Sequence, residues 1–162
     1  MDDITNALFS ASRQGNVAVL QEIFCIINNV DVTDERGFTP LIIAAYNNQA
    51  GAVQALLDAG AAIDATDASG NTALMGACFK GYAEIAQLLI SNGANVNAAH
   101  GNGGTALMFA VMFGRNDMIS LLVNNGADTT IKDNRGLTAL DIAHQQHNSA
   151  AAAMLQEYVE GN

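Results

Sequence analysis

The sequence repeats itself every 33 residues, and this period constrains the fold more than any other feature. Four kinds of position recur at this step: Gly37, Gly70, Gly103 and Gly136; Thr39, Thr72, Thr105 and Thr138; Leu41, Leu74, Leu107 and Leu140; and Leu56, Leu89, Leu122 and Leu155. Leu8 and Ala11 carry the register back into a first unit. Such a period is typical of solenoids, whose units pack only on their neighbours. The sequence therefore predicts a single domain over residues 1–162, with units at about 1–33, 34–66, 67–99, 100–132 and 133–162.

Each unit predicts a turn, a short helix, a loop and a second helix. Turn-forming residues at 67–71 precede Thr72, which is a good N-cap, and Pro40 follows Thr39 at a first helical position. The first helices are predicted to end at residues that accept a left-handed backbone: Gly15, Asn48, Gly81, Gly114 and His147. The second helices end in Leu-Leu pairs, at 56–57, 88–89 and 121–122, which we expect to face the core. The fold class is thus an all-α solenoid of about five helix-turn-helix repeats joined by short hairpin-like turns.

Composition and charge narrow the classes of function. Hydrophobic residues make up 50% of the chain and charged residues 14%, which argues against disorder. The net charge of −10 disfavours binding to nucleic acid or to anionic membranes. No apolar run approaches the ~18 residues of a membrane span, and the acidic start at 1–4 is unlike a leader, although a leader removed earlier is compatible with it. We expect a cytoplasmic protein.

The cysteine pattern agrees with that compartment. Cys25 and Cys78 fall two units apart in the repeat register, which is too far for a disulfide between stacked helices. Two free thiols fit a reducing environment. Cys78 aligns with Ala45, so we interpret it as a small core residue, whereas the irregular first unit leaves the place of Cys25 open.

Residues 37–41 (Gly-Phe-Thr-Pro-Leu), the Ala44-Ala45 pair and residues 56–61 (Leu-Leu-Asp-Ala-Gly-Ala) resemble the ankyrin repeat family. The resemblance covers essentially the whole chain. The Thr-Ala-Leu-Met motif is similar to the sequences of small standalone bacterial ankyrin proteins. It implies a non-enzymatic protein-binding module without cofactors. The family carries a bridging histidine where this chain has Ile42, Met75, Met108 and Asp141. We therefore expect apolar packing between repeats in place of a polar network, and the atypical first and last units to act as caps.

The resemblance also implies where a partner binds: on the turn tips and on the concave face of the first helices. The candidate residues at these places are Arg13, Arg36, Phe38, Tyr46, Asn47, Phe79, Lys80, Met112, Phe113 and Arg135. Tyr46, Phe79 and Met112 are 33 residues apart, so stacking would align them in one apolar stripe. Aromatic residues and Met are enriched at binding surfaces. The alternative is that these rings pack between repeats and only support the stack.

Charge is distributed unevenly over the predicted faces. Five of the six bases fall on the turn tips and first helices: Arg13, Arg36, Lys80, Lys132 and Arg135. The acids fall mainly on second helices and loops, apart from those that open turns. We therefore expect one protein partner with an apolar, partly acidic surface, bound by a monomer that acts as an inhibitor or immunity-type protein. The alternative is that so small a count of bases is scattered by chance.

Other chemistry finds little support in the sequence. Residues 100–105 are glycine-rich but lack the Gly-Lys-Ser/Thr ending of a phosphate loop, and they coincide with the repeat turn. His144 and His147 share a helix face without a third metal ligand, and Asp141 lies at a helix start where a cap carboxylate is expected. We predict no catalytic, cofactor or metal site. A small enzyme that uses Cys25 or Asp141, or an adaptor for a ligand or membrane surface, stays the alternative.

Overall fold

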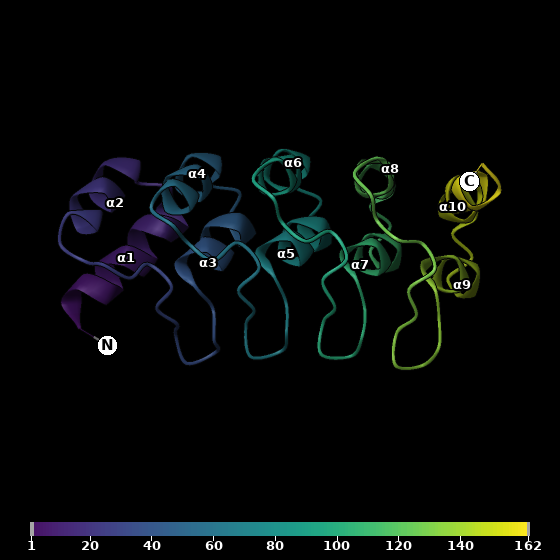
Figure 1. Cartoon of the computed structure of the whole chain (residues 1–162), viewed down its shortest axis with the longest axis horizontal. Coiled ribbons are helices and arrows are strands. Elements are labelled where there is room, and N and C mark those ends of the chain that lie inside the picture. The colour runs from purple at the N-terminus through teal and green to yellow at the C-terminus, as the bar shows by residue number, and fades with distance from the viewer. Residues whose placement is uncertain (1, 162) are drawn as a thin grey trace.

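The computed structural model describes residues 2–161, and over that range it contains ten helices in five consecutive pairs and no strand (Figure 1). The pairs are α1 (Asp3–Gln14) and α2 (Val17–Phe24), α3 (Pro40–Tyr46) and α4 (Ala50–Asp58), α5 (Ala73–Lys80) and α6 (Ala83–Ser91), α7 (Ala106–Met112) and α8 (Asn116–Asn124), and α9 (Ala139–Gln145) and α10 (Ser149–Glu160). The predicted all-α solenoid is confirmed. Met1 and Asn162, at the ends of the predicted first and last units, lie outside the described residues.

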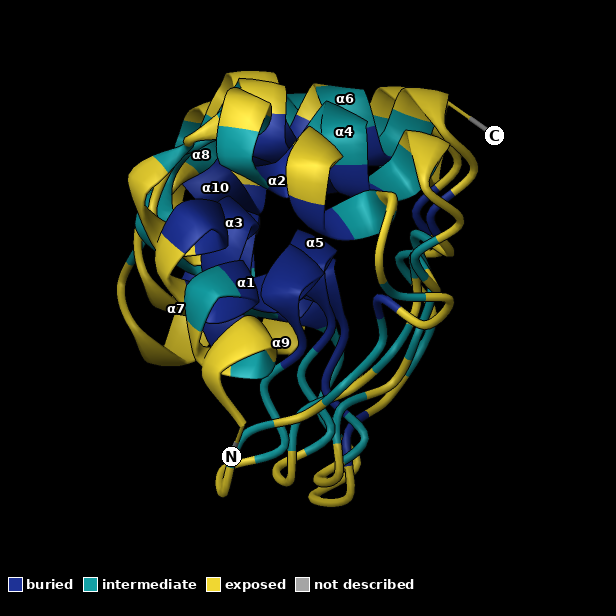
Figure 2. Cartoon of the chain, turned by 90° about the vertical axis from the view of Figure 1, so that its left-hand side faces the viewer, coloured by how far each residue is buried: buried dark blue, intermediate teal, exposed yellow. Residues whose placement is uncertain are grey.

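The helices form two layers along the stack. The first helices, α1, α3, α5, α7 and α9, contact one another in sequence, and the second helices, α2, α4, α6, α8 and α10, form a parallel row behind them (Figure 1). The connections between pairs project beyond the first helices as a row of finger-like turns. Viewed along the stack, the buried residues lie between the two layers while the turn tips are exposed (Figure 2). We call the side on which the first helices meet the turns the front face.

The helix ends follow the predicted signals. Thr39, Thr72, Thr105 and Thr138 are N-caps, each accepting a hydrogen bond from the N–H three residues later, and Pro40 occupies the first turn of α3. A left-handed residue follows every first helix: Gly15, Asn48, Gly81, Gly114 and His147, with φ between 56° and 78°. Asn48 (φ 58°) and His147 (φ 56°) are the two non-glycine residues in this conformation among those described. Both accept it at a modest cost because the left-handed region is open to such residues.

The core is continuous through the stack. Leu56, Leu89, Leu122 and Leu155 are fully buried, one in each of the last four pairs. The other leucine of each Leu-Leu pair is only half-buried, at Leu57, Leu88 and Leu121, so the expectation that both members face the core was half right. The helical period explains this, because neighbouring residues point about 100° apart.

The positions that resemble the family's bridging histidine are apolar and buried, as expected. Ile42, Met75 and Met108 are each 2% exposed and join the core. Asp141 is exposed instead and forms a capping box: it accepts from the N–H of Thr138, and Thr138 accepts from the N–H of Asp141. The prediction of a cap carboxylate is confirmed at this position.

Two ladders of hydrogen bonds tie neighbouring units together. At the turn tips, the N–H groups of Ala68, Gly101 and Asn134 donate to the carbonyls of Arg36, Ser69 and Asn102, at 3.0, 3.3 and 2.9 Å respectively. Between the second helices, Asp31, Asp64 and Asn97 each accept, through a side-chain oxygen, from the N–H 31 residues later, at 2.8 to 3.1 Å. Each ladder recurs once per unit, so the register of the turns is held at both ends of the repeat.

The first unit departs from the others at its second helix. Helix α2 ends at Phe24, and Cys25 follows in a right-handed conformation. Ile27, in register with the stop glycines Gly60, Gly93 and Gly126, has no left-handed backbone. The first unit thus lacks both the turn and the helix stop of the internal units, as expected for a cap.

Truncating a core leucine tests this packing. Leu89→Ala should lower the free energy of unfolding by about 3 kcal/mol, because it leaves a cavity at a fully buried site. Leu88→Ala, at the neighbouring half-buried site on the same helix, should cost less than half as much. Urea unfolding followed by circular dichroism measures both; equal losses would contradict the described orientation of α6.

Candidate functional site

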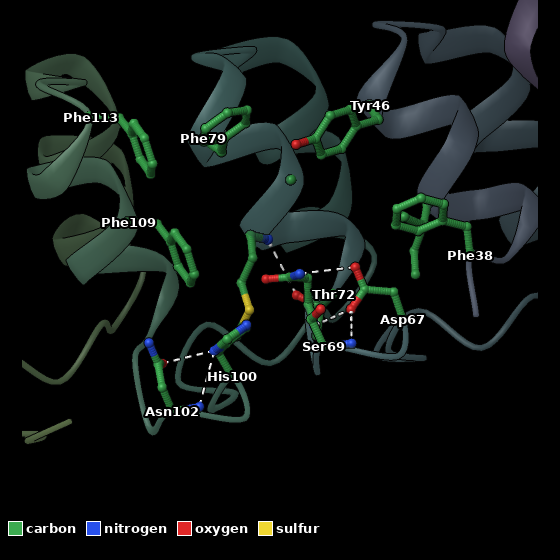
Figure 3. A pocket seen from close by; sticks show the side chains of 14 residues that line it. Phe38, Tyr46, Asp67, Ser69, Thr72, Phe79, His100, Asn102, Phe109 and Phe113 are labelled. Atoms are coloured by element: carbon green, nitrogen blue, oxygen red, sulfur yellow. Dashed lines mark hydrogen bonds between the residues drawn. The ribbon is translucent and has the colours of Figure 1, made fainter. Parts of the chain in front are cut away.

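Side chains of three consecutive units surround a hollow on the front face (Figure 3). Its volume is about 370 Å³. Phe38 and Tyr46 come from the start and end of the α3 region, Phe79 from the end of α5, and Phe109 and Phe113 from α7 and its C-cap. The turns close the lower side with Asp67, Ser69, Asn71, His100 and Asn102. A volume above about 300 Å³ is in the range of ligand and side-chain pockets.

Four rings form a connected series across these units. The centroids of Tyr46 and Phe79 are 5.9 Å apart with the rings nearly parallel, and Phe79 meets Phe113 edge to face at 4.5 Å. Phe113 and Phe109 are parallel at 6.4 Å, and Phe109 meets the His100 ring at 5.5 Å. These spacings are those that aromatic pairs prefer. We call the rings of Tyr46, Phe79, Phe113 and Phe109 the ring row.

The path of the row differs from the predicted stripe. Tyr46 is 37% exposed and Phe113 is 43% exposed, while Phe79 between them is half-buried. Met112 is 39% exposed but lines a neighbouring hollow of about 300 Å³ together with Phe109 and Arg135. The row passes from Phe79 to Phe113, which follows Met112 in the sequence, because Met112 in register with Phe79 carries no ring. Met112 therefore lies beside the row and outside its hollow.

The predicted basic residues occupy different settings. Lys80 places its Nζ 4.9 Å from the centroid of Tyr46 and 5.8 Å from that of Phe79, which is a cation–π arrangement. Arg135 forms a salt bridge of 2.7 Å with Asp133 in its own turn. Arg13, Arg36 and Lys132 are exposed and are not part of the hollow's lining. Lys80 is thus the candidate cation that lies against the ring row.

Asn47 has a local structural bond. Its Nδ2 donates to the carbonyl of Ile43 at 2.8 Å, which closes the end of α3, and the residue is exposed. The same interaction recurs at other helix ends, where Asn92 and Asn125 donate to Leu88 and Leu121. Asn47 lies near the rim of the front face, but this bond occupies its amide.

The aspartate carboxylates of the turns accept hydrogen bonds from N–H groups of their own turns. Asp67 Oδ1 accepts from the N–H groups of Ser69 and Asn71 at 2.8 and 2.9 Å, and its Oδ2 accepts from Asn71 Nδ2 at 2.9 Å. Asp34 and Asp133 bind their turns through the same pair of backbone N–H groups. Partial burial of Tyr46, and next the charge of Asp67, raise the pKa of the Tyr46 phenol above its usual value.

The fourth unit builds the same turn with different side chains. His100 stands in register with the turn aspartates, and its Nδ1 lies 3.1 Å from the backbone nitrogen of Asn102, which donates to it. Asn102 Oδ1 then accepts from the N–H of Gly104 at 2.9 Å. The glycine-rich segment 100–105 is therefore the repeat turn, as predicted.

Comparison with known proteins agrees with this geometry. A family model described as ankyrin repeats (3 copies) matches residues 8–100, and one described as ankyrin repeats (many copies) matches residues 89–143. The chain belongs to the ankyrin repeat family. A human relative, Ankyrin repeat and SOCS box protein 3, is 37% identical over 60 residues, which are 37% of this chain and 12% of that protein. The match thus spans a small part of the relative.

Ankyrin repeats are protein–protein interaction modules and are generally non-enzymatic. Within residues 2–161, no three His, Cys, Asp or Glu side chains are arranged to hold a metal ion, His144 and His147 included. No helix in that range is long and apolar enough to cross a bilayer. Burial raises the pKa of the Cys78 thiol to about 12, with a smaller contribution from the charge of Asp117, so this thiol is inert as a nucleophile.

Comparing the ankyrin units position by position identifies residues that the prediction missed. Gly76 lines the hollow at a register position where the second, fourth and fifth units carry Ile43, Phe109 and Ile142. Phe109, half-buried in α7 one turn before Phe113, was not among the predicted residues. Arg115 reaches back to the third unit, where its Nε donates to the carbonyl of Phe79 at 3.2 Å. Alignment of the units could have identified Gly76 and Phe109 from the sequence. The contact of Arg115 depends on its side-chain rotamer, which the sequence does not give.

The two thiols should differ sharply in reactivity. Cys25 is exposed, with its thiol donating to the Gln21 carbonyl at 3.4 Å, while Cys78 is fully buried. In the native protein we expect Ellman's reagent to titrate one thiol quickly, and two after denaturation. Cys25→Ser should abolish the fast reaction. Rapid reaction of both thiols in the native state would contradict the described burial of α5.

The turn carboxylates should make the fold sensitive to acid. The hydrogen bond from the Leu137 N–H, followed by the contacts with Arg135, lowers the pKa of Asp133. A lowered folded-state pKa stabilises the fold above the unfolded value of about 3.9, and this contribution is lost as pH falls below it. Asp133→Asn should therefore destabilise the protein at pH 7. The difference in free energy of unfolding between the variant and the wild type should narrow as pH falls from about 5 to about 2. Urea unfolding midpoints of both proteins across that pH range measure this difference in stability. A difference that does not change with pH would count against this role for Asp133.

Proposed function

We propose that the chain binds one protein partner on the concave front face of its ankyrin stack, with the ring row at the centre of the contact. The observation that carries this proposal is a connected series of rings that spans three units and keeps Tyr46 and Phe113 more than a third exposed. Aromatic side chains lose little conformational entropy on binding and are enriched among residues that dominate interface energies. The family's general role as an interaction module supports the same conclusion.

The alternative is that these rings only support the stack, and part of each ring does pack between units. The first-helix core residues show how complete such packing can be, because Ile42, Met75 and Met108 keep only 2% exposure. The ring row retains far more exposed area than stacking requires. Contiguous apolar surface of this kind usually marks a binding site.

Charge on the front face supports an apolar partner with acidic groups. Over residues 2–161 the one salt bridge joins Arg135 to Asp133, so Arg13, Arg36, Lys80 and Lys132 have no carboxylate partner in this range. Unpaired cations around an apolar centre favour carboxylates at the rim of the contact and hasten encounter. The net charge of −10 resides mainly on other faces and disfavours nucleic acid as a partner.

The proposal extends to the biological use of the contact. We infer that residues 1–162 act as one binding unit, as a monomer, and that the bound partner is held in an inhibitor or immunity-type complex. A standard interface buries about 800 Å² on each side, which is a tenth of the 7724 Å² exposed by this chain. The exposed thiol of Cys25 supports a reducing compartment such as the cytoplasm.

The ring row can be tested by deleting two of its members. A tagged chain is used to isolate the partner, and affinities are then measured by calorimetry with the Tyr46→Ala, Phe79→Ala double variant. Loss of two central aromatic residues should cost at least about 2 kcal/mol, or roughly 30-fold in affinity.

The matched control removes two exposed side chains on the second-helix layer, Glu84→Ala with Gln87→Ala on α6, and should leave affinity unchanged. Both double variants must keep the wild-type helical spectrum and a monomer mass by light scattering. Unchanged affinity in the ring variant, or loss only in the control, would show that the partner binds elsewhere.

A further inference from the structure

The hollow beneath the ring row exists because one unit lacks a side chain that its neighbours possess. At this register position the second and fifth units carry the buried Ile43 and Ile142, and the fourth carries Phe109, but the third carries Gly76. A Cβ on Gly76 would lie 2.8 Å from Tyr46 Cδ2, a distance at which the ring must move. The missing side chain therefore lets the Tyr46 ring lie over α5 and leaves the space between Tyr46 and Phe109 open (Figure 3).

The walls of this hollow suit an apolar group. Rings of Phe38, Tyr46, Phe79 and Phe109 surround it, and Gly76 is also among its lining residues. Several polar groups along its lower side are occupied in their own turns. Asp67 accepts three hydrogen bonds from Ser69 and Asn71, and Asn102 accepts from Gly104. Thr72 accepts from the N–H of Met75 as the N-cap of α5.

The charge at the rim of the hollow is unbalanced. Lys80 lies against the faces of Tyr46 and Phe79, and its ammonium has no carboxylate partner within residues 2–161. Asp67, the anion among the lining residues, accepts three hydrogen bonds within its own turn, which occupy its carboxylate oxygens but leave its charge in place. An incoming cation would also meet the charge of Lys80. A carboxylate beside the hollow would meet an ammonium that the rings hold in place.

We propose that the hollow over Gly76 receives one large apolar side chain of the partner protein, and that a carboxylate next to that side chain pairs with Lys80. This inference rests on the proposed function and names the recognition element of the same surface. The occupant is thus an apolar residue flanked by Asp, Glu or a C-terminal carboxylate. A cationic side chain is the competing occupant, which Asp67 would attract and the unpaired ammonium of Lys80 would repel.

Three small probes with the same ring and spacer test the hollow without the partner. They are 3-phenylpropionate, 3-phenylpropionamide and 3-phenylpropylammonium, which carry negative, no and positive charge at pH 7. Each is titrated into the ¹⁵N-labelled full chain, and amide shifts are followed by NMR. We expect shifts that cluster at Ser69, Gly76, Phe79 and His100. The anion should bind about threefold tighter than the amide, as an exposed ion pair allows, and the cation should bind most weakly.

Two variants assign the parts of the site. Gly76→Ile copies the residue of the second and fifth units and should weaken all three probes at least several-fold by filling the hollow. Gly51→Ala, a glycine replacement on α4 away from the hollow, should leave binding unchanged. Lys80→Gln should keep the amide affinity and remove the advantage of the anion. The amide spectrum of each variant reports whether the stack is intact.

Several outcomes would overturn the inference. These are tightest binding by the cation, absence of shifts at the hollow up to the solubility of the probes, or an anion advantage that survives Lys80→Gln. The isolated partner separates this inference from the broader proposal. If Gly76→Ile leaves partner affinity unchanged while loss of Tyr46 and Phe79 abolishes it, the front face binds the partner but the hollow does not. If the probes bind as expected and the ring variant keeps full partner affinity, the broader proposal fails instead.

Discussion

Close packing of small residues between neighbouring first helices is the constraint on which the rest of this structure depends. The pairs Ala44-Ala45, Ala77-Cys78 and Ala110-Val111 are fully buried, so each first helix lies directly against the next. That approach brings the turn tips close enough for one backbone hydrogen bond per unit. It also places side chains 33 residues apart within ring contact. A larger residue at these positions would separate the units and interrupt both the ladder and the ring row.

The front face combines regular and irregular elements of the repeat. The N-cap threonine and the helix-ending left-handed residue recur with little variation, and they keep the internal first helices in register. Variation in sequence falls between these fixed points, where Gly76 replaces a bulky residue and His100 replaces an aspartate. The scaffold tolerates both, because the turn at His100 recovers its hydrogen bonds through Asn102. Changes of this kind give the protein a surface that identical repeats would not have.

The fold was largely predictable from sequence because its signals are repeated and local. Caps such as Thr72, stops such as Gly81 and the buried leucines of the second helices each appeared at the expected place. The surface was harder to predict because it depends on how far side chains extend across units. Equal spacing placed Met112 in the stripe, but Phe79 makes its ring contact with the next residue, Phe113. A glycine that creates space through absence of a side chain carries no positive signal unless the units are compared with one another.

The position of the ring row within the stack has a dynamic consequence. Its residues belong to the second, third and fourth units, and one further unit lies on either side. In a solenoid, opening proceeds most easily from the ends, because a terminal unit has a single neighbour. Fraying of α1 and α2, or of α9 and α10, would leave the rings on ordered backbone. Local unfolding of the outer units would therefore leave the proposed binding surface in place.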